Sequence, residues 1–167
     1  AETAALTLEA TDLAELVIDA VDDLWPQSQA KGITVTAPEV HDGILVAADR
    51  SLLTRVLINL IDNAIKFTDP GGRITCVISM EEASPQGVIC EIEDTGRGMS
   101  AEDVERVFER FRTSSGAQRV EGVGLGLAFV QTVVQRHGGV VTCESRLGVG
   151  TRFKVSLPRW EGEGARS

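Results

Sequence analysis

The chain is organised around residues 51–68, where apolar residues recur at the spacing of a helix. At 3.6 residues per turn, one apolar stripe is formed by Leu53, Val56, Leu57, Leu60, Ile61, Ala64 and Ile65. Close beside it, Asn59, Asn63 and Lys66 follow one another at i, i+4 and i+7. Buried amides and ammonium groups are costly unless they meet polar partners. The pattern predicts a central helix whose polar line faces either a magnesium–phosphate ligand or a neighbouring loop.

The remaining segments alternate between helical and strand-like patterns. Further helices are expected from Thr11 or Asp12 to about Ala30, over 101–107 and from Gly122 to about His137. Pro26 is expected to kink the first of these or to mark its end. Strands are expected over 33–36, 44–47, 73–81, 87–94, 140–145 and 151–157. The order lacks a regular βαβ rhythm, so we expect an α/β chain of the α+β two-layer sandwich type, with a mixed, largely antiparallel sheet and three main helices on one face.

A length of 167 residues suits one domain with a substantial core. Residues 1–10 are expected to be a tether or the end of a preceding helical domain, 11–158 the folded domain and 159–167 a polar tail. The net charge of −9 argues against a nucleic-acid-binding surface. No apolar run approaches the roughly 20 residues of a membrane span, and the N-terminus shows no signal-peptide pattern.

The cysteines, Cys76, Cys90 and Cys143, are odd in number and have no close pair. This argues against a disulfide framework or a zinc site. Each lies in a strand-like run, so we expect small core or sheet residues in a reducing compartment.

Two glycine-rich segments carry further candidate chemistry. Asp94-Thr-Gly-Arg-Gly98 places a carboxylate at a strand end and two glycines after it, so that a flat ring can approach the backbone. The carboxylate could accept a hydrogen bond from the exocyclic amine of adenine, or could simply cap a tight turn. Gly122-x-Gly-x-Gly126 opens a helix, where backbone amides form an anion site. It is neither a Walker loop nor a dinucleotide fingerprint. Before it, residues 112–122 are small and polar, as in a lid.

Taken in order, these motifs resemble the catalytic ATP-binding domain of sensor histidine kinases, in the superfamily that includes gyrase, heat-shock chaperone and mismatch-repair ATPases. The resemblance covers about residues 12–157 and rests on Asn59–Lys66 as the N box, Asp94–Gly98 and Gly122–Gly126 as glycine boxes, Phe108–Phe111 as the F box, and Gly150-Thr151. It implies a Bergerat-type fold, ATP and Mg²⁺ as cofactors, and transfer of the γ-phosphoryl group to a histidine on a separate domain.

The resemblance also implies a role for each matching residue. Asn63 would ligate Mg²⁺ with Asn59 in support, Lys66 would contact a phosphate, and Asp94 would accept a hydrogen bond from the adenine amino group. Phe67 would lie near the adenine face, or could be a core residue. The remaining expected contacts are Gly96, Gly98, Met99 and Thr151 around the base, Gly122, Gly124, Leu125, Gly126 and Leu127 at the triphosphate, and Arg110 and Arg112 beside the lid. The two arginines could instead dock the partner domain, and Arg110 could be solvated.

Asn59 separates a kinase from an ATPase. The hydrolytic members that this chain resembles carry Glu one helical turn before the metal-binding Asn, where it activates water. An amide cannot take a proton near neutral pH. The resemblance therefore implies phosphoryl transfer by positioning and metal electrostatics, with little hydrolysis.

Neither His41 nor His137 has the context of a phosphoacceptor. The expected partners are therefore a His-containing dimerisation domain of the same protein and a response regulator receiver domain, with no nucleic acid. We expect the fragment to be monomeric, its parent homodimeric and its location cytoplasmic, on its own or as part of a membrane-bound sensor. A protein-serine kinase of the anti-sigma-factor type and a pseudokinase binding module are the alternatives. The long first helix and the F box argue against the former, and the intact boxes against the latter.

Overall fold

The computed structural model describes residues 5–39, 44–81, 87–109 and 123–160, with side chains from residue 126 onward in the last range. Its helices are α1 (Leu13–Ala30), α2 (Arg50–Phe67), α3 (Ala101–Glu105) and α4 (Val123–Arg136). Its strands are β1 (Glu9–Asp12), β2 (Thr34–Thr36), β3 (Leu45–Ala48), β4 (Arg73–Met80), β5 (Gly87–Asp94), β6 (Val140–Arg146) and β7 (Gly150–Pro158). No helix in these ranges is long and apolar enough to cross a membrane.

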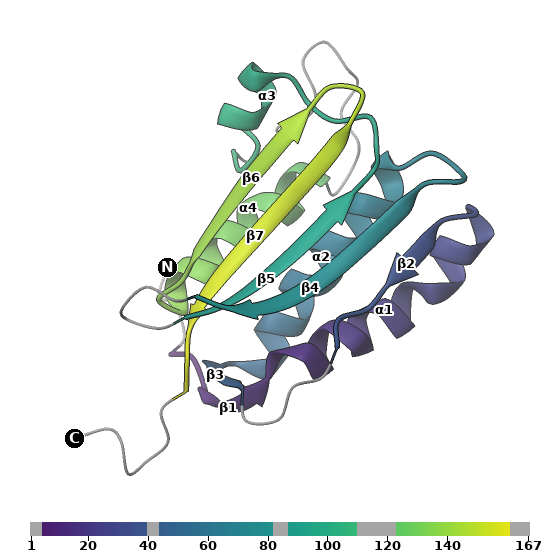
Figure 1. Ribbon diagram of the computed structural model, residues 1–167. Coiled ribbons are helices and arrows are strands. Elements are labelled where there is room, and N and C mark those ends of the chain that lie inside the picture. The colour runs from purple at the N-terminus through teal and green to yellow at the C-terminus, as the bar shows by residue number, and fades with distance from the viewer. Residues whose placement is uncertain (1–4, 40–43, 82–86, 110–122, 161–167) are drawn as a thin grey trace.

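One sheet of five strands, in the order β2-β4-β5-β7-β6, forms one layer of the described structure. β2 pairs with β4 in parallel, and the other neighbours are antiparallel. α1, α2 and α4 lie side by side behind the sheet, with α2 in the middle (Figure 1). This arrangement confirms the predicted two-layer fold with a mixed, largely antiparallel sheet.

The central helix forms where the sequence predicts it. Asp49 caps its N-terminus, with Oδ1 accepting from the amide of Leu52 at 3.2 Å. Every residue of the apolar stripe is buried, none more than 5% exposed. Each large side chain buried in this way contributes about 1.5–3 kcal/mol, so α2 is fixed against the sheet and both neighbouring helices.

The inner face of the sheet completes the core. Strands β4, β5 and β7 turn alternate apolar residues toward the helices, which is the pattern of a sheet with one solvated face: Ile74, Cys76, Val88, Cys90, Ile92, Phe153, Val155 and Leu157. Burial raises the pKa of the Cys76 thiol to about 12, and that of Cys90 further still. Both thiols are therefore protonated core groups, as the sequence predicts.

α1 continues through Pro26 to Ala30 and is capped by Lys31, so of the two alternatives for this proline, a kink or the end of the helix, the second is wrong. Proline removes one backbone hydrogen bond. Leu24 and Ser28, on either side of Pro26, are buried. Their packing stabilises the helix where this hydrogen bond is missing. The end comes at Gly32, whose φ of +77° favours glycine.

A small antiparallel sheet, which the sequence analysis missed, joins β1 to β3. Arg159 forms a β-bridge with Val46, and the amide of Trp160 donates to the carbonyl of Leu45 at 2.7 Å. Strands this short carry little pattern of their own, so only the fold reveals their pairing.

Candidate nucleotide-binding site

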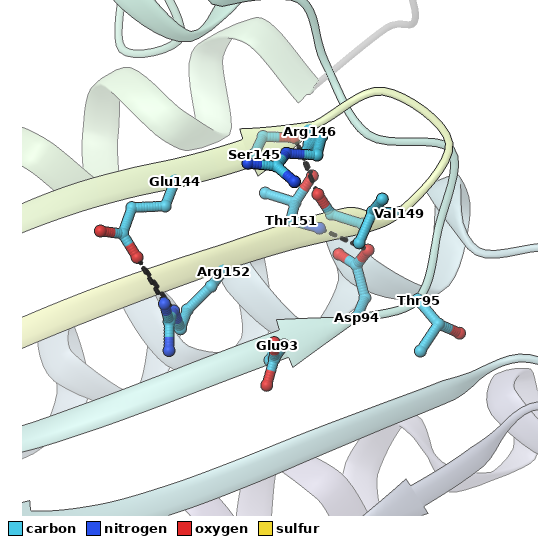
Figure 2. A pocket seen from close by; sticks show the side chains of 10 residues that line it. Glu93, Asp94, Thr95, Glu144, Ser145, Arg146, Val149, Thr151 and Arg152 are labelled. Atoms are coloured by element: carbon cyan, nitrogen blue, oxygen red, sulfur yellow. Dashed lines mark hydrogen bonds and ion pairs between the residues drawn. The ribbon is translucent and has the colours of Figure 1, made fainter.

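Asp94 lies at the end of β5 and is only 5% exposed. Its Oδ1 atom accepts a hydrogen bond from the amide of Gly96 at 2.8 Å. It accepts a second one from the amide of Thr151 at 3.2 Å (Figure 2). Burial raises the pKa of this carboxyl above its usual value, and the two amides oppose that shift. Its Oδ2 atom accepts no hydrogen bond from the described residues. One oxygen is thus fixed by the backbone, and the other is available to a ligand.

The turn after β5 requires its glycines. A side chain at Gly96 would collide with the carbonyl of Phe67, and one at Gly98 would collide with the carbonyl of Arg146. Gly98 also has a φ of +74°, which favours glycine. The amide of Arg97 donates to the carbonyl of Phe67 at 3.2 Å, so the turn is sealed against the last residue of α2. The two glycines are therefore required for this turn to pack against the end of α2 and the end of β6.

Ser145 is a site residue that sequence reasoning missed. Its Oγ accepts from the amide of Met99 at 2.7 Å, lies 2.8 Å from Oγ1 of Thr151, and lies 3.0 Å from the carbonyl of Gly150. It is directly opposite Thr151 in the β6–β7 register, which places Asp94, Thr151 and Ser145 in one cross-strand row. The available signal was the alternation of β6, which puts Ser145 on the same face as buried Val141.

A hollow of about 360 Å³ opens beside this row (Figure 2). Its lining takes Asp94, Ser145 and Thr151 from one face of the sheet, and Glu93, Glu144 and Arg152 from the other. On the second face Arg152 bonds Glu144 at 2.6 Å, and the carboxylate of Glu93 is exposed to solvent. The side of Asp94 and Thr151 is the one that offers a buried acceptor.

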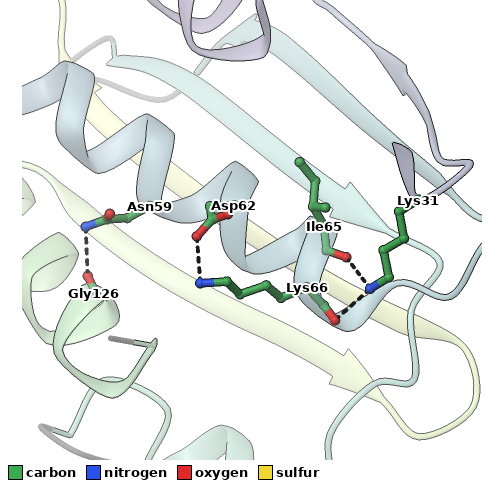
Figure 3. Close-up of polar contacts among 6 residues, drawn as sticks. All are labelled: Lys31, Asn59, Asp62, Ile65, Lys66 and Gly126. Atoms are coloured by element: carbon green, nitrogen blue, oxygen red, sulfur yellow. Dashed lines mark hydrogen bonds and ion pairs between the residues drawn. The ribbon is translucent and has the colours of Figure 1, made fainter. Parts of the chain in front are cut away.

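The polar line of α2 runs from Asn59 toward the glycine turn that follows Asp94. The side-chain amide of Asn59 lies 3.5 Å from the carbonyl of Gly126 in the first turn of α4 (Figure 3), which is a long contact. One turn further along α2, the Oδ1 atom of Asn63 is buried without a hydrogen-bond partner among the described residues. Leaving such an atom without a hydrogen bond costs about 1–3 kcal/mol. The Oδ1 atom of Asn63 is therefore a candidate ligand for a bound cation.

Lys66 and Phe67 are the last two residues of α2 and lie at the end of its polar line. The Nζ atom of Lys66 lies 2.9 Å from Asp62 in a partly exposed ion pair, which solvent and salt weaken (Figure 3). Phe67 is half-buried, with the guanidinium group of Arg97 at 5.5 Å from its ring centroid. Both residues lie on the turn of α2 that meets the glycine turn.

The other expected residues fall into three groups. Gly124, Leu125 and Gly126 lie in the first turn of α4, where unpaired helix amides attract anions. The side chain of Leu127 is buried in the core, which leaves only its backbone for a ligand, whereas that of Met99 packs against the core and is partly exposed. Arg110, Arg112 and Gly122 lie outside the described residues.

His137 has a structural role. It is 6% exposed, with Nδ1 at 2.8 Å from the carbonyl of Val133 and Nε2 accepting from the amide of Asp49 at 3.0 Å. Both ring nitrogens are engaged, so this imidazole pins α4 to the cap of α2. These contacts agree with the expectation that His137 is not the phosphoacceptor. The other histidine, His41, lies outside the described residues. No group of three or more His, Cys, Asp or Glu side chains could hold a metal ion in the described ranges.

Comparison with known proteins supports what this geometry suggests. Residues 48–161 match the family described as histidine kinase-, DNA gyrase B- and HSP90-like ATPases. The chain belongs to this family. Within it, the domain is of the histidine kinase type found in sensor kinases. It is 38% identical over 148 residues to the histidine protein kinase DivJ of Caulobacter vibrioides, covering 88% of this chain and 24% of DivJ.

Solved structures give the same result for the fold. The mycobacterial sensor histidine kinase MprB superposes with a TM-score of 0.75 at 30% identity, covering 90% of this chain and 98% of that structure. Full-length ShkA in complex with AMPPNP superposes with a TM-score of 0.81 at 29% identity, covering 95% of this chain and 32% of ShkA. The histidine kinase ATPase domain spans well under half of the length of the curated relatives it matches.

Proposed function

We propose that this domain binds ATP with Mg²⁺ and passes the γ-phosphoryl group to a histidine on a separate dimerisation domain of its parent sensor kinase. The observation that carries the proposal is the pair of unused acceptors, Oδ2 of Asp94 and Oδ1 of Asn63, at two ends of one site. Both are oxygen atoms, one suited to an amine donor and the other to a hard cation.

At the base end, Asp94 recognises the adenine amino group through Oδ2. Its Oδ1 atom is held by two backbone amides, so the carboxylate is oriented before the nucleotide arrives. Thr151 and Ser145 share a hydroxyl contact beside it and can hold a water against the base. Gly96 and Gly98 let the turn after Asp94 pack directly on the backbones of Phe67 and Arg146, and Phe67 would lie near the face of the base.

At the phosphate end, the fit to Mg²⁺ rests on the orphaned amide oxygen of Asn63. Asn63 would hold the ion and Asn59 would support it, while the amides at the start of α4, including those of Gly124 and Leu125, would receive phosphate oxygens. When bound, Mg²⁺ neutralises charge on the β- and γ-phosphates. Lys66 joins them by exchanging its weak contact with Asp62 for a phosphate.

Asn59 directs this site toward transfer. Its amide contacts α4 and cannot abstract a proton from water, so the site positions the γ-phosphoryl group without activating a water molecule. The acceptor must therefore come from outside, on the helical domain of the parent. Arg110 and Arg112 would contact the γ-phosphate or that domain. A response regulator receiver domain would then take the phosphoryl group, in the cytoplasm.

The test is a transfer assay with the His-containing helical domain of the parent protein, γ-labelled ATP and Mg²⁺. We expect acid-labile, alkali-stable label on that domain, at least about 100-fold less label with Asn63→Ala, and wild-type labelling with the exposed control Thr142→Ala. Acid-stable label would instead indicate a serine kinase. Absence of both label and ATP binding would indicate a pseudokinase.

A further inference from the structure

The carbonyl end of α2 is closed by a lysine from the end of α1. The Nζ atom of Lys31 donates to the carbonyl of Ile65 at 2.8 Å and to that of Lys66 at 3.0 Å (Figure 3). A helix leaves its last four carbonyls unbonded and carries partial negative charge at that end, so a cation there is favourable on both counts. The only basic residue in the last turn of α2, Lys66, contacts Asp62 instead. Lys31 therefore supplies the cation from another element.

The backbone around Lys31 is built to hold it there. Its amide donates to the carbonyl of Gln27 at 3.2 Å and closes α1. Gly32 then reverses the chain with a φ of +77° and accepts from the amide of Gly71 at 2.9 Å. Ile33 follows and is only 2% exposed. The ammonium group has no carboxylate partner among the described residues, so its role is to bind the α2 carbonyls.

The same turn of α2 also contacts the glycine turn that follows Asp94. The carbonyl of Phe67 accepts from the amide of Arg97 at 3.2 Å, inside the glycine turn that follows Asp94. The last turn of α2 is thus clamped between Lys31 and that glycine turn. In an α-helix the carbonyl of residue 63 bonds the amide of residue 67, so fraying of this turn would release Asn63 as well.

We propose that Lys31 is a positioning residue for the Mg²⁺–triphosphate site. It holds the last turn of α2 in register with Asp94, so that Asn63 meets the Mg²⁺ ion on the phosphates of a nucleotide whose base is already fixed. The inference rests on the proposed function, and adds to it a residue that lies 34 positions before Ile65 in the chain and acts through backbone carbonyls.

The test is the affinity for ATP with and without Mg²⁺, measured by calorimetry on the whole 167-residue chain, and on variants of it. We expect Lys31→Met to fold and to bind Mg²⁺–ATP about 10-fold more weakly, the size typical of losing a group that orients a metal ligand. Lys31→Arg should restore affinity to within about 3-fold, because a guanidinium group can also donate to two carbonyls. The control is Lys154→Met, an exposed lysine of β7, which should bind as wild type.

A role in global stability alone would give a different result. The effect should lie in the Mg²⁺-dependent gain in affinity, with the Mg²⁺-free affinity retained, and should disappear in the Asn63→Ala background, because it acts through Asn63. Wild-type affinity in Lys31→Met, an equal loss with and without Mg²⁺, or failure of that variant to fold would each overturn the proposal. Failure of the wild-type chain itself to bind ATP would instead contradict the proposed function.

Discussion

Replacing Asp94 by Asn should separate the stability of the domain from its ability to bind nucleotide. Asn keeps an Oδ1 acceptor for the amides of Gly96 and Thr151, so the turn can remain intact. The second oxygen becomes an NH₂ group, which would face the amino group of adenine donor to donor. A single atom changes from acceptor to donor, and the shape of the side chain is conserved.

The expected stability change follows from the raised pKa of Asp94, whose usual value is 3.8. A carboxyl with a higher pKa in the folded state stabilises the fold below its unfolded pKa, and this contribution is lost as the pH rises through the folded pKa. At neutral pH the buried, ionised carboxylate is therefore a cost to the domain. Asp94→Asn removes that cost, so its melting temperature should equal or exceed that of the wild type, and its advantage should shrink toward acid pH.

The expected loss of binding is large. A hydrogen bond to a charged group contributes about 1.5–3 kcal/mol, and an unpaired buried donor costs about 1–3 kcal/mol more. Together they predict a Kd for ATP that is roughly 10²- to 10⁴-fold higher, since each 1.4 kcal/mol is a factor of ten. Calorimetric titration gives the Kd and differential scanning calorimetry the melting temperature. The control is Asp23→Asn, which makes the same change at an exposed carboxylate of α1 away from the site.

Two results would refute this reasoning. ATP binding by Asp94→Asn within about five-fold of wild type would show that Oδ2 does not contact the base. A melting temperature several degrees below wild type would show that the ionised carboxylate stabilises the turn.

The remaining predictions concern packing, thiols and the cap of α2. Gly96→Ala should destabilise the domain by about 1–3 kcal/mol in urea unfolding, because its methyl group would overlap the carbonyl of Phe67. Cys76 and Cys90 should resist a thiol reagent in the native protein and react on unfolding, since both are buried and protonated, and rapid native labelling would contradict this burial. The amides of Thr7 and Leu52 lower the pKa of Asp49 below its usual value of 3.8. The ionised carboxylate therefore stabilises the fold at pH values above 3.8, and this stabilisation is lost as the pH falls through the lower pKa of the folded state. Acid unfolding of Asp49→Ala should therefore show less pH dependence in that range than wild type, and an identical profile would count against the cap.

The sequence alone predicts the parts of this fold that have strong local patterns. Seven apolar positions at helical spacing define α2, and alternation bounded by glycine and proline locates β4 and β5. The placement of Asp94 also follows, because a strand that ends in Asp-x-Gly-x-Gly has one side chain at its terminus. Identification of the family rests on the order of such motifs, which no single motif supplies.

What the sequence does not predict depends on contacts between distant residues. Lys31 and the carbonyl of Ile65 are 34 residues apart, and Met99 and Ser145 are 46 apart, so no local pattern joins them. Pairing of β1 with β3 depends in the same way on the path of the chain around α1. The continuation of α1 through Pro26 shows packing overriding a local preference.

The most direct test of the central claim, that Asn63 provides the metal-binding end of an ATP site, is a titration of wild type and Asn63→Ala with ATP, in excess Mg²⁺ and again in excess chelator. The account predicts that Mg²⁺ lowers the Kd of the wild type by about ten-fold or more and leaves that of the variant unchanged. The two proteins should bind ATP alike in chelator, because Asp94 and the base pocket are intact in both. An equal effect of Mg²⁺ on both proteins would contradict the account.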